Sequence, residues 1–275
     1  MSKAEESFSF TFNKIKMQSG LKVTILGSGT SVGVPQVGCP CPVCHSDDPR
    51  DRRLRASALL ETDEGRRLLI DCGPDFRQQM LSVDFLPLDG VIFTHEHYDH
   101  TGGIDDLRPF TRTDDGLPLF ADEKCAKHIR ERLPYLFREH LYPGVPRIRL
   151  EVVQPGVPFV VENYWEVMPI PVMHGKLPIL GYRFGDFAYV TDMTEVPEEG
   201  LRLLQGVRFI VVNALREKPH PTHQSLSQAL DFVKKLDVEK AWLTHFSHEI
   251  GFHREVQSQL PENVYLTFDG LKFRI

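Results

Sequence analysis

The hydrophobic positions of the chain fall into short apolar runs that alternate with stretches of helical spacing. Runs of strand length end at Gly, Pro, Asn or Asp, and they predict two successive halves in which strands precede helices. No Gly/Ser-rich linker separates the halves, so we expect one α/β domain with four layers, α/β/β/α, in which two sheets face each other and helices lie outside. The pattern predicts strands at 21–26, 56–61, 66–71, 91–94, 117–121, 207–213 and 240–243, short strands across 151–191, and helices at 74–83, from Asp122 onward, at 197–204 and at 224–236.

The first twenty residues form a separate segment. Phe8, Phe10 and Phe12 alternate with Ser and Thr, and this period of two predicts a strand with one buried face. Such a strand would lie at an edge or contact a partner chain, which leaves a homodimer open. We therefore predict an N-terminal extension over 1–20 and a single domain over 21–275.

Composition limits the kind of partner. The chain has 275 residues, 41% of them hydrophobic, which is enough for one full core. The formal net charge of −6 and the absence of a long Lys/Arg block argue against a nucleic-acid partner and favour a small substrate. No signal-peptide pattern and no run of about eighteen apolar residues occurs, so we expect a cytoplasmic protein without a membrane span. Cys72 and Cys125 stand beside apolar residues and are expected to be buried free thiols.

A dense group of titratable residues follows the apolar run 91–94. Placing so many polar groups at a strand end is costly unless cations neutralise them. His95 and His97 are two apart, so an extended chain aims both the same way, whereas the turn that carries Asp99 and His100 swings a second pair around. One strand end can thus supply two adjacent ions, and these ligands suit zinc, manganese or iron better than calcium or magnesium. The alternative is a solvated His-rich loop.

A second metal signal lies in the loop at 38–50. Three cysteines with the spacing C-x-C-x₂-C on a Pro-containing turn can converge on one tetrahedral zinc ion. His45 is adjacent, but neighbouring residues rarely reach the same ion comfortably, so His248 is the better fourth ligand. The alternative is three reduced structural cysteines. The cysteines are Cys39, Cys41 and Cys44.

The order of these groups resembles the metallo-β-lactamase-fold hydrolases. In that family H-x-H-x-D-H after an apolar strand is followed by a lone His, an Asp at a strand end and a His near the C-terminus, and the chain has His174, Asp192 and His245 in that order. The resemblance spans roughly 21 to 275 and implies the four-layer αββα metallo-β-lactamase fold. It also implies that His95, His97 and His174 hold one ion, that Asp99, His100 and His245 hold the other, and that Asp192 bridges them.

Further motifs are similar to those of the phosphoribosyl 1,2-cyclic phosphate phosphodiesterases. G-S-G-T-S-x-G-x-P is followed by G-C-x-C-x-x-C, then by H-G-K-L and T-H-x-S-H. That subfamily opens a cyclic phosphodiester on a ribose, and its dinuclear site is often manganese-dependent. The resemblance implies a phosphodiesterase acting on a small cyclic or nucleotide-like phosphodiester. Its cofactors would be two active-site ions of manganese, zinc or iron, and one structural zinc on Cys39, Cys41, Cys44 and His248.

The resemblance also implies roles in catalysis. Asp99 and Asp192 would serve the reaction as well as the metals. Asp71 ends an apolar strand and matches an early Asp that orients ligating imidazoles, although an ordinary turn Asp fits the position equally well. His223 matches a catalytic His that is not a ligand and would protonate the leaving alkoxide. His220 is its competitor, and a polar loop His is the alternative for both.

Other activities of the same fold stay open. A tRNA 3′-end endonuclease shares the seven ligands but usually brings a long flexible arm, and the chain has no Gly/Pro/basic insert of that kind. Thioester or lactone hydrolysis is chemically feasible at the same metals. A di-iron redox enzyme would have Glu in place of His97, and a non-catalytic module would have lost ligands. The aromatic, Pro-broken stretch at 133–150 receives no role.

Overall fold

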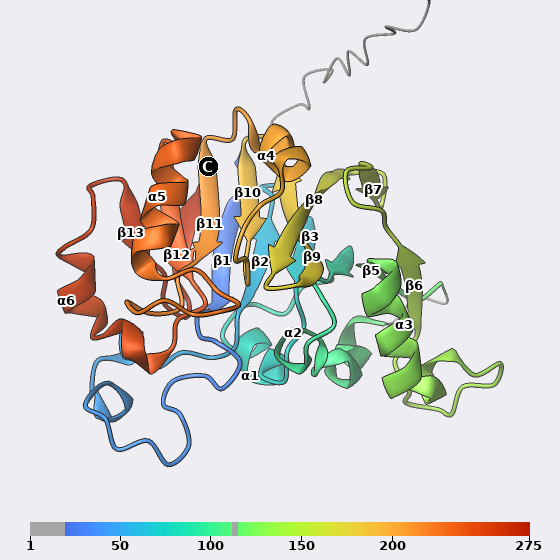
Figure 1. Ribbon diagram of the computed structural model, residues 1–275. Coiled ribbons are helices and arrows are strands. Elements are labelled where there is room, and N and C mark those ends of the chain that lie inside the picture. Colours follow the sequence, from blue (N-terminus) through green and yellow to red (C-terminus); the bar gives the residue numbers. More distant parts are fainter. Residues whose placement is uncertain (1–19, 112–114) are drawn as a thin grey trace, which may run out of the picture.

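The computed structural model describes residues 20–111 and 115–275 (Figure 1). Within them the chain forms two mixed seven-stranded sheets with helices on their outer sides. The four-layer arrangement predicted from the sequence is therefore confirmed. The strand predicted around Phe8, Phe10 and Phe12 lies outside the described residues.

The first sheet contains the N-terminal strands and one strand from the C-terminus. Its members from β3 to β6 run parallel, whereas β1 pairs antiparallel with both of its neighbours. The last strand, β14, is thus the edge strand next to the first, β1. The order is β14 (Lys272–Arg274), β1 (Lys22–Gly27), β2 (Ser57–Glu61), β3 (Arg67–Ile70), β4 (Gly90–Ile92), β5 (Leu117–Ala121) and β6 (Ile148–Val152).

The second sheet is built from the C-terminal half. Its strands from β10 to β13 run parallel, and an antiparallel meander adds β9, β8 and β7. Parallel strands end at a common edge, which is where site residues gather. The order is β13 (Val264–Leu266), β12 (Lys240–Thr244), β11 (Phe209–Asn213), β10 (Phe187–Val190), β9 (Leu177–Phe184), β8 (Trp165–His174) and β7 (Phe159–Val161).

Short helices cover the sheets. None of the described helices is long and apolar enough to cross a membrane. The α-helices are α1 (Phe76–Met80), α2 (Tyr98–Thr101), α3 (Glu123–Arg132), α4 (Glu198–Leu204), α5 (Leu226–Leu236) and α6 (His253–Gln257). The 3₁₀ helices are η1 (Val43–His45), η2 (Pro49–Asp51), η3 (Ile104–Phe110), η4 (Pro134–Phe137) and η5 (His248–Ile250).

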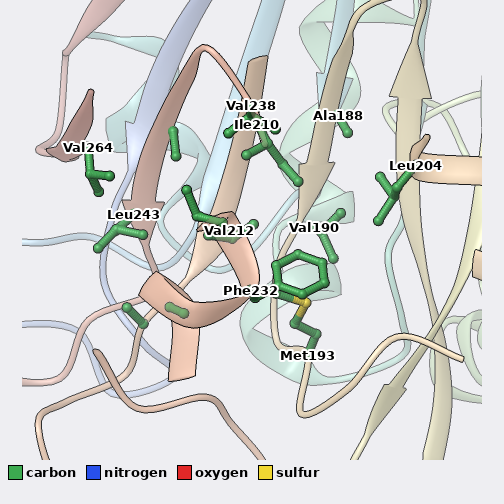
Figure 2. Close-up of a cluster of buried hydrophobic side chains, with 14 of the residues drawn as sticks. Ala188, Val190, Met193, Leu204, Ile210, Val212, Phe232, Val238, Leu243 and Val264 are labelled. Atoms are coloured by element: carbon green, nitrogen blue, oxygen red, sulfur yellow. The ribbon is translucent and has the colours of Figure 1, made fainter. Parts of the chain in front are cut away.

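Alternation along the strands divides the core into layers. On β10, Ala188 and Val190 face the helices, whereas Tyr189 faces the other sheet. Successive strand residues point to opposite faces, so a strand with helices on one side and a sheet on the other must be apolar throughout. Figure 2 shows the helix-facing cluster, to which Phe232 of α5, Val190 and Met193 belong.

Differences from the predicted elements occur where elements are short. β13, β14 and α6 were not predicted, since three-residue strands and a five-residue helix contain too few positions to show a period. The helix predicted at 74–83 is limited to α1. His174 is the last residue of β8.

Asp122 provides a test of how α3 begins. Its carboxylate accepts the backbone N–H of Cys125 at 2.7 Å, as expected of an N-cap. Asp122→Ala should lower the free energy of unfolding by about 1 kcal/mol, and Asp122→Asn, which keeps an acceptor oxygen, should lose less. Denaturant unfolding measures both, and an Ala variant as stable as the wild type would contradict the capping role.

Candidate metal centre

The site lies where β3, β4, β8, β10 and β12 end. Three residues just after these strands adopt the left-handed backbone conformation without being glycine, namely Asp71 (φ 61°), Asp192 (φ 58°) and His245 (φ 62°). This conformation is uncommon for residues other than glycine, and residues that adopt it cluster at functional sites. Each bend turns the chain sharply at the edge of the sheet and places a buried polar side chain there.

One group of ligand atoms consists of three imidazoles. Nε2 of His95 lies 2.9 Å from Nδ1 of His97, and the ring of His174 lies 5.6 Å and 5.2 Å from these two rings. One nitrogen from each ring falls within 4.8 Å of the others. The three residues predicted to share one ion are therefore brought together.

A second group joins two carboxylates to two imidazoles. Asp192 turns one oxygen to Nε2 of His245 at 3.0 Å and the other to Nε2 of His100 at 3.3 Å. Asp99 lies 3.2 Å from His100 and 3.8 Å from His245 through one oxygen. Asp192 also has a ligand atom within 4.8 Å of one in His174, so it can reach both groups.

The charges in this group compensate one another. Burial opposes charge on His245, but the carboxylates of Asp192 and Asp99 raise its pKa to about 9. Although burial favours the neutral acid, the imidazoles of His245 and His100 hold the pKa of Asp192 well below its ordinary value. The directions of these pKa shifts favour ionised carboxylates at Asp99 and Asp192 and protonated imidazoles at His100 and His245.

Several ring nitrogens in these groups lack a hydrogen-bond partner among the described residues, which also favours metal binding. Nε2 of His100 and both ring nitrogens of His245 have no correctly oriented hydrogen-bond partner in the described part of the chain. Buried polar atoms are normally satisfied, and divalent ions would bind these nitrogens in place of protons. The buried His/Asp cluster is therefore consistent with a metal site.

Asp71 lies behind this group and outside the ligand sets. Its Oδ2 accepts Nδ1–H of His100 at 2.7 Å, and its Oδ1 accepts the backbone N–H of Thr94 at 2.8 Å. This bond places the proton of His100 on Nδ1 and leaves Nε2 free to bind an ion. The hydroxyl of Thr94 also donates to Oδ2 of Asp71 at 2.9 Å, and neither contact with Thr94 was predicted from the sequence.

His223 lies between the two groups of candidate ligands. Its ring lies 4.6 Å from that of His174 and 4.9 Å from that of His245, and its Nδ1 is 3.7 Å from Asp192. Burial and the neighbouring His245 lower its pKa to about 3. His220 is farther out, with its ring 5.2 Å from that of His223. A nitrogen of His223 is also within 4.8 Å of ligand atoms of His174 and Asp192, so its place suits either a ligand or a proton donor.

The cysteine loop forms a separate cluster with His248. Nδ1 of His248 lies 3.1 Å from Sγ of Cys41 and 3.5 Å from Sγ of Cys39, and Sγ of Cys44 completes a group of four within 4.8 Å. His45 turns away, with its Nδ1 against the carbonyl of Cys41 at 3.1 Å. The four side chains that meet are those proposed from the sequence for a structural ion.

The environment of this cluster favours a thiolate at Cys41, whereas burial raises the pKa of the Cys44 thiol to about 11. The backbone N–H of Gln36 donates to Sγ of Cys44, and that of Cys44 donates to Sγ of Cys41, both at 3.4 Å. Burial raises the pKa of the Cys41 thiol, but hydrogen bonds from Cys44 and His248 lower it to about 6. Since the thiolate is the form that binds metal, three cysteines and one histidine fit a tetrahedral zinc shell.

A family model and two relatives in sequence match long stretches of the chain. Residues 66–246 match the family described as "Beta-lactamase superfamily domain". The chain is 44% identical over 253 residues to the octanoyltransferase of Porphyromonas gingivalis, which covers 92% of this chain and 51% of that protein. It is 31% identical over 153 residues to coenzyme PQQ synthesis protein B of Rhodopseudomonas palustris, covering 50% of this chain and 48% of that protein. The two alignments thus span about half the length of each relative.

Solved structures give the same fold. A diphosphatase from the PhnP family superposes with a TM-score of 0.86 at 38% identity, covering 93% of this chain and 97% of that one. Zn²⁺-bound PqqB from Methylobacterium extorquens superposes with a TM-score of 0.74 at 17% identity, covering 92% of this chain and 100% of that one. The second likeness concerns the fold alone.

The bond between Asp71 and His100 can be tested without a substrate. Asp71→Asn keeps the volume but presents an amide to Nδ1 of His100, which favours the wrong tautomer. Metal affinity of the His/Asp cluster should fall about 10- to 100-fold, as for other partners of ligating histidines. Competition with a chelator measures it. Unchanged affinity would make Asp71 an ordinary turn residue, and Asp75→Asn, in a carboxylate that pairs with Arg55 instead, is the control.

Proposed function

The chain belongs to the beta-lactamase superfamily, and on that premise we propose that it is a metal-dependent phosphodiesterase. Its substrate would be a small cyclic or nucleotide-like phosphodiester of the 5-phosphoribosyl 1,2-cyclic phosphate type. The observation that carries the proposal is Asp192, whose carboxylate lies within reach of two neighbouring groups of metal ligands. The 38% identity with a PhnP-family diphosphatase supports phosphate chemistry.

Two ions would share the site. The ions, when bound, would activate a water molecule and neutralise charge on the phosphoryl oxygens. Manganese, zinc or iron suits the donor set, and a third ion, zinc, would be held by Cys39, Cys41, Cys44 and His248. One catalytic ion would be held by His95, His97 and His174, the other by Asp99, His100 and His245, and both by Asp192.

The protein's own groups would then orient and transfer protons. Asp71 keeps the proton of His100 on Nδ1, and Asp192 fixes the spacing of the two ligand groups. His223 turns its Nδ1 toward Asp192, which leaves Nε2 to give a proton to the departing ribose oxygen. Burial and His245 lower the pKa of His223, and the negative charge of a bound phosphodiester would raise this pKa and favour the acid form.

An acyl substrate is the second candidate. The 44% identity with a protein named octanoyltransferase favours it, and the water activation that bound ions would supply suits hydrolysis of a thioester or lactone as well as of a phosphodiester. The octanoyl specificity of that relative belongs to a protein about twice as long as the alignment, so it gives only a substrate class to test. A tRNA 3′-end endonuclease activity is the third candidate, and the substrate panel described next tests it as well.

A substrate panel decides between these functions. The metal-loaded protein should hydrolyse 5-phosphoribosyl 1,2-cyclic phosphate, or a related cyclic phosphate, with a kcat/KM at least tenfold above its value on an octanoyl thioester, a lactone or precursor tRNA. Preference for the thioester would replace the phosphodiesterase proposal with acyl hydrolysis. Asp192→Ala, prepared in parallel, controls for contaminating activity.

Metal content separates the two kinds of ion site. Elemental analysis of the reconstituted protein should find two ions at the His/Asp cluster and one zinc at the cysteine cluster. Asp192→Ala should lose activity while keeping its cysteine-bound zinc, whereas Cys41→Ala should chiefly lower the melting temperature, because structural zinc contributes folding energy. A single ion per wild-type chain would contradict the assignment, as would a Cys41→Ala variant that is inactive yet as stable as the wild type.

The role of His223 depends on the leaving group. His223→Ala should retain both ions and slow hydrolysis of a cyclic ribose phosphate by about 10²- to 10⁴-fold, the usual contribution of a general acid. A p-nitrophenyl phosphodiester should be slowed much less, since p-nitrophenolate leaves without a proton. His220→Ala is the matched control. Equal losses on both substrates would assign His223 to phosphate binding, and loss of an ion would make it a ligand.

A further inference from the structure

Two of the loops that carry site residues meet at the side chain of Thr194. Thr194 follows Asp192 by two positions, and its backbone N–H donates to the carbonyl of Met173 at 2.7 Å, at the end of β8. Its Oγ1 accepts the backbone N–H of Gly175 at 2.6 Å, directly beside His174. These two hydrogen bonds join the loop after β10 to the loop after β8.

The same hydroxyl reaches a third loop, the one that carries His223. Oγ1 of Thr194 donates to the backbone carbonyl of Thr222 at 2.8 Å. The backbone N–H of Gln224 donates to the carbonyl of Met193 at 3.1 Å, so this contact has a second support one residue away. A single hydroxyl therefore bonds to backbone groups of both other loops.

The carbonyl of Thr222 has a second donor, which is Nδ1 of His174 at 2.7 Å. A carbonyl oxygen only accepts hydrogen bonds, so the proton of His174 must be on Nδ1. Nε2 then keeps its lone pair and is the atom available to an ion. Thr194 donates to the same oxygen and so helps to fix where that carbonyl points.

We propose that Thr194 is a positioning residue for metal binding. Its hydroxyl holds the Thr222 carbonyl in the orientation that sets the tautomer and ring direction of His174. The same bond keeps the loop of His223 against the site. The loops approach so closely that a Cβ on Gly175 would lie 3.0 Å from the Thr222 side chain. The inference rests on the proposed two-ion site but does not depend on the substrate class.

Two substitutions at Thr194 separate the hydroxyl from the shape of the side chain. Thr194→Val removes the hydroxyl at nearly constant volume, and Thr194→Ser retains it. Mn²⁺ binding to the metal-freed protein, measured by chelator competition, should weaken about 10- to 100-fold for one of the two ions in the Val variant and stay near the wild-type value in the Ser variant. Thr194→Ala replaces the Val variant if the latter does not fold.

The tautomer of His174 gives a readout that needs no metal. In ¹⁵N NMR of the metal-free protein, its Nδ1 should carry the proton in the wild type and in Thr194→Ser, and the two tautomers should mix in Thr194→Val. Thr267→Val is the matched control, because its buried hydroxyl also donates to a backbone carbonyl, that of Leu243, at 2.7 Å. That variant should lose stability without any change in Mn²⁺ affinity.

A double-mutant cycle with His174→Ala tests whether Thr194 acts through this ligand. If it does, adding Thr194→Val to His174→Ala should cost no further Mn²⁺ affinity. Additive losses, equal losses in the Val and Ser variants, or unchanged affinity in Thr194→Val would each overturn the inference. A wild-type protein that binds fewer than two Mn²⁺ ions at the His/Asp cluster would instead overturn the proposed site itself, so the two failures are distinguishable.

Discussion

Charge compensation among buried groups at one edge of the sheets is the constraint on which the rest of the structure depends. Asp192 is 2% exposed and has an imidazole against each carboxylate oxygen. Neither the carboxylate nor these imidazoles would be stable there unpaired. Strands from both sheets must therefore end side by side and turn at once, and the left-handed bends at Asp71, Asp192 and His245 meet this requirement.

Most of the fold could be predicted from the sequence because buried strands in a four-layer protein are apolar on both faces. The runs that became β5, β11 and β12 are of this kind, and each prediction lies within two residues of the observed strand. β13 and β14 could not be found in this way. They owe their place to pairing with β12 and β1, which is a tertiary effect that three residues do not encode.

The site, like the fold, has features that could be predicted from the sequence and features that could not. The strand-end residues around His95 and the cysteine cluster could be proposed from motif spacing, whereas His174, Asp192 and His245 came from the resemblance to the family. The choice of His248 over His45 followed from a steric argument, and the geometry agrees with it. Asp71 was proposed as an orienting group through the resemblance, and it contacts His100. The Thr222 carbonyl that orients His174 could not be proposed, because a backbone carbonyl is available at every position and leaves no mark in the residue pattern.

The cysteine cluster connects parts of the chain that are far apart in sequence. Cys39 and His248 are 209 positions apart, and the nearby bond from Ser28 to Asp269 spans 241. An ion that bridged this cluster in the unfolded polypeptide would close a loop that contains most of the chain. Such a closure restricts the unfolded ensemble as a long-range cross-link does, and its cost rises only slowly with loop length. The ion would thus act on the stability of both sheets, although it touches only four side chains at their margin.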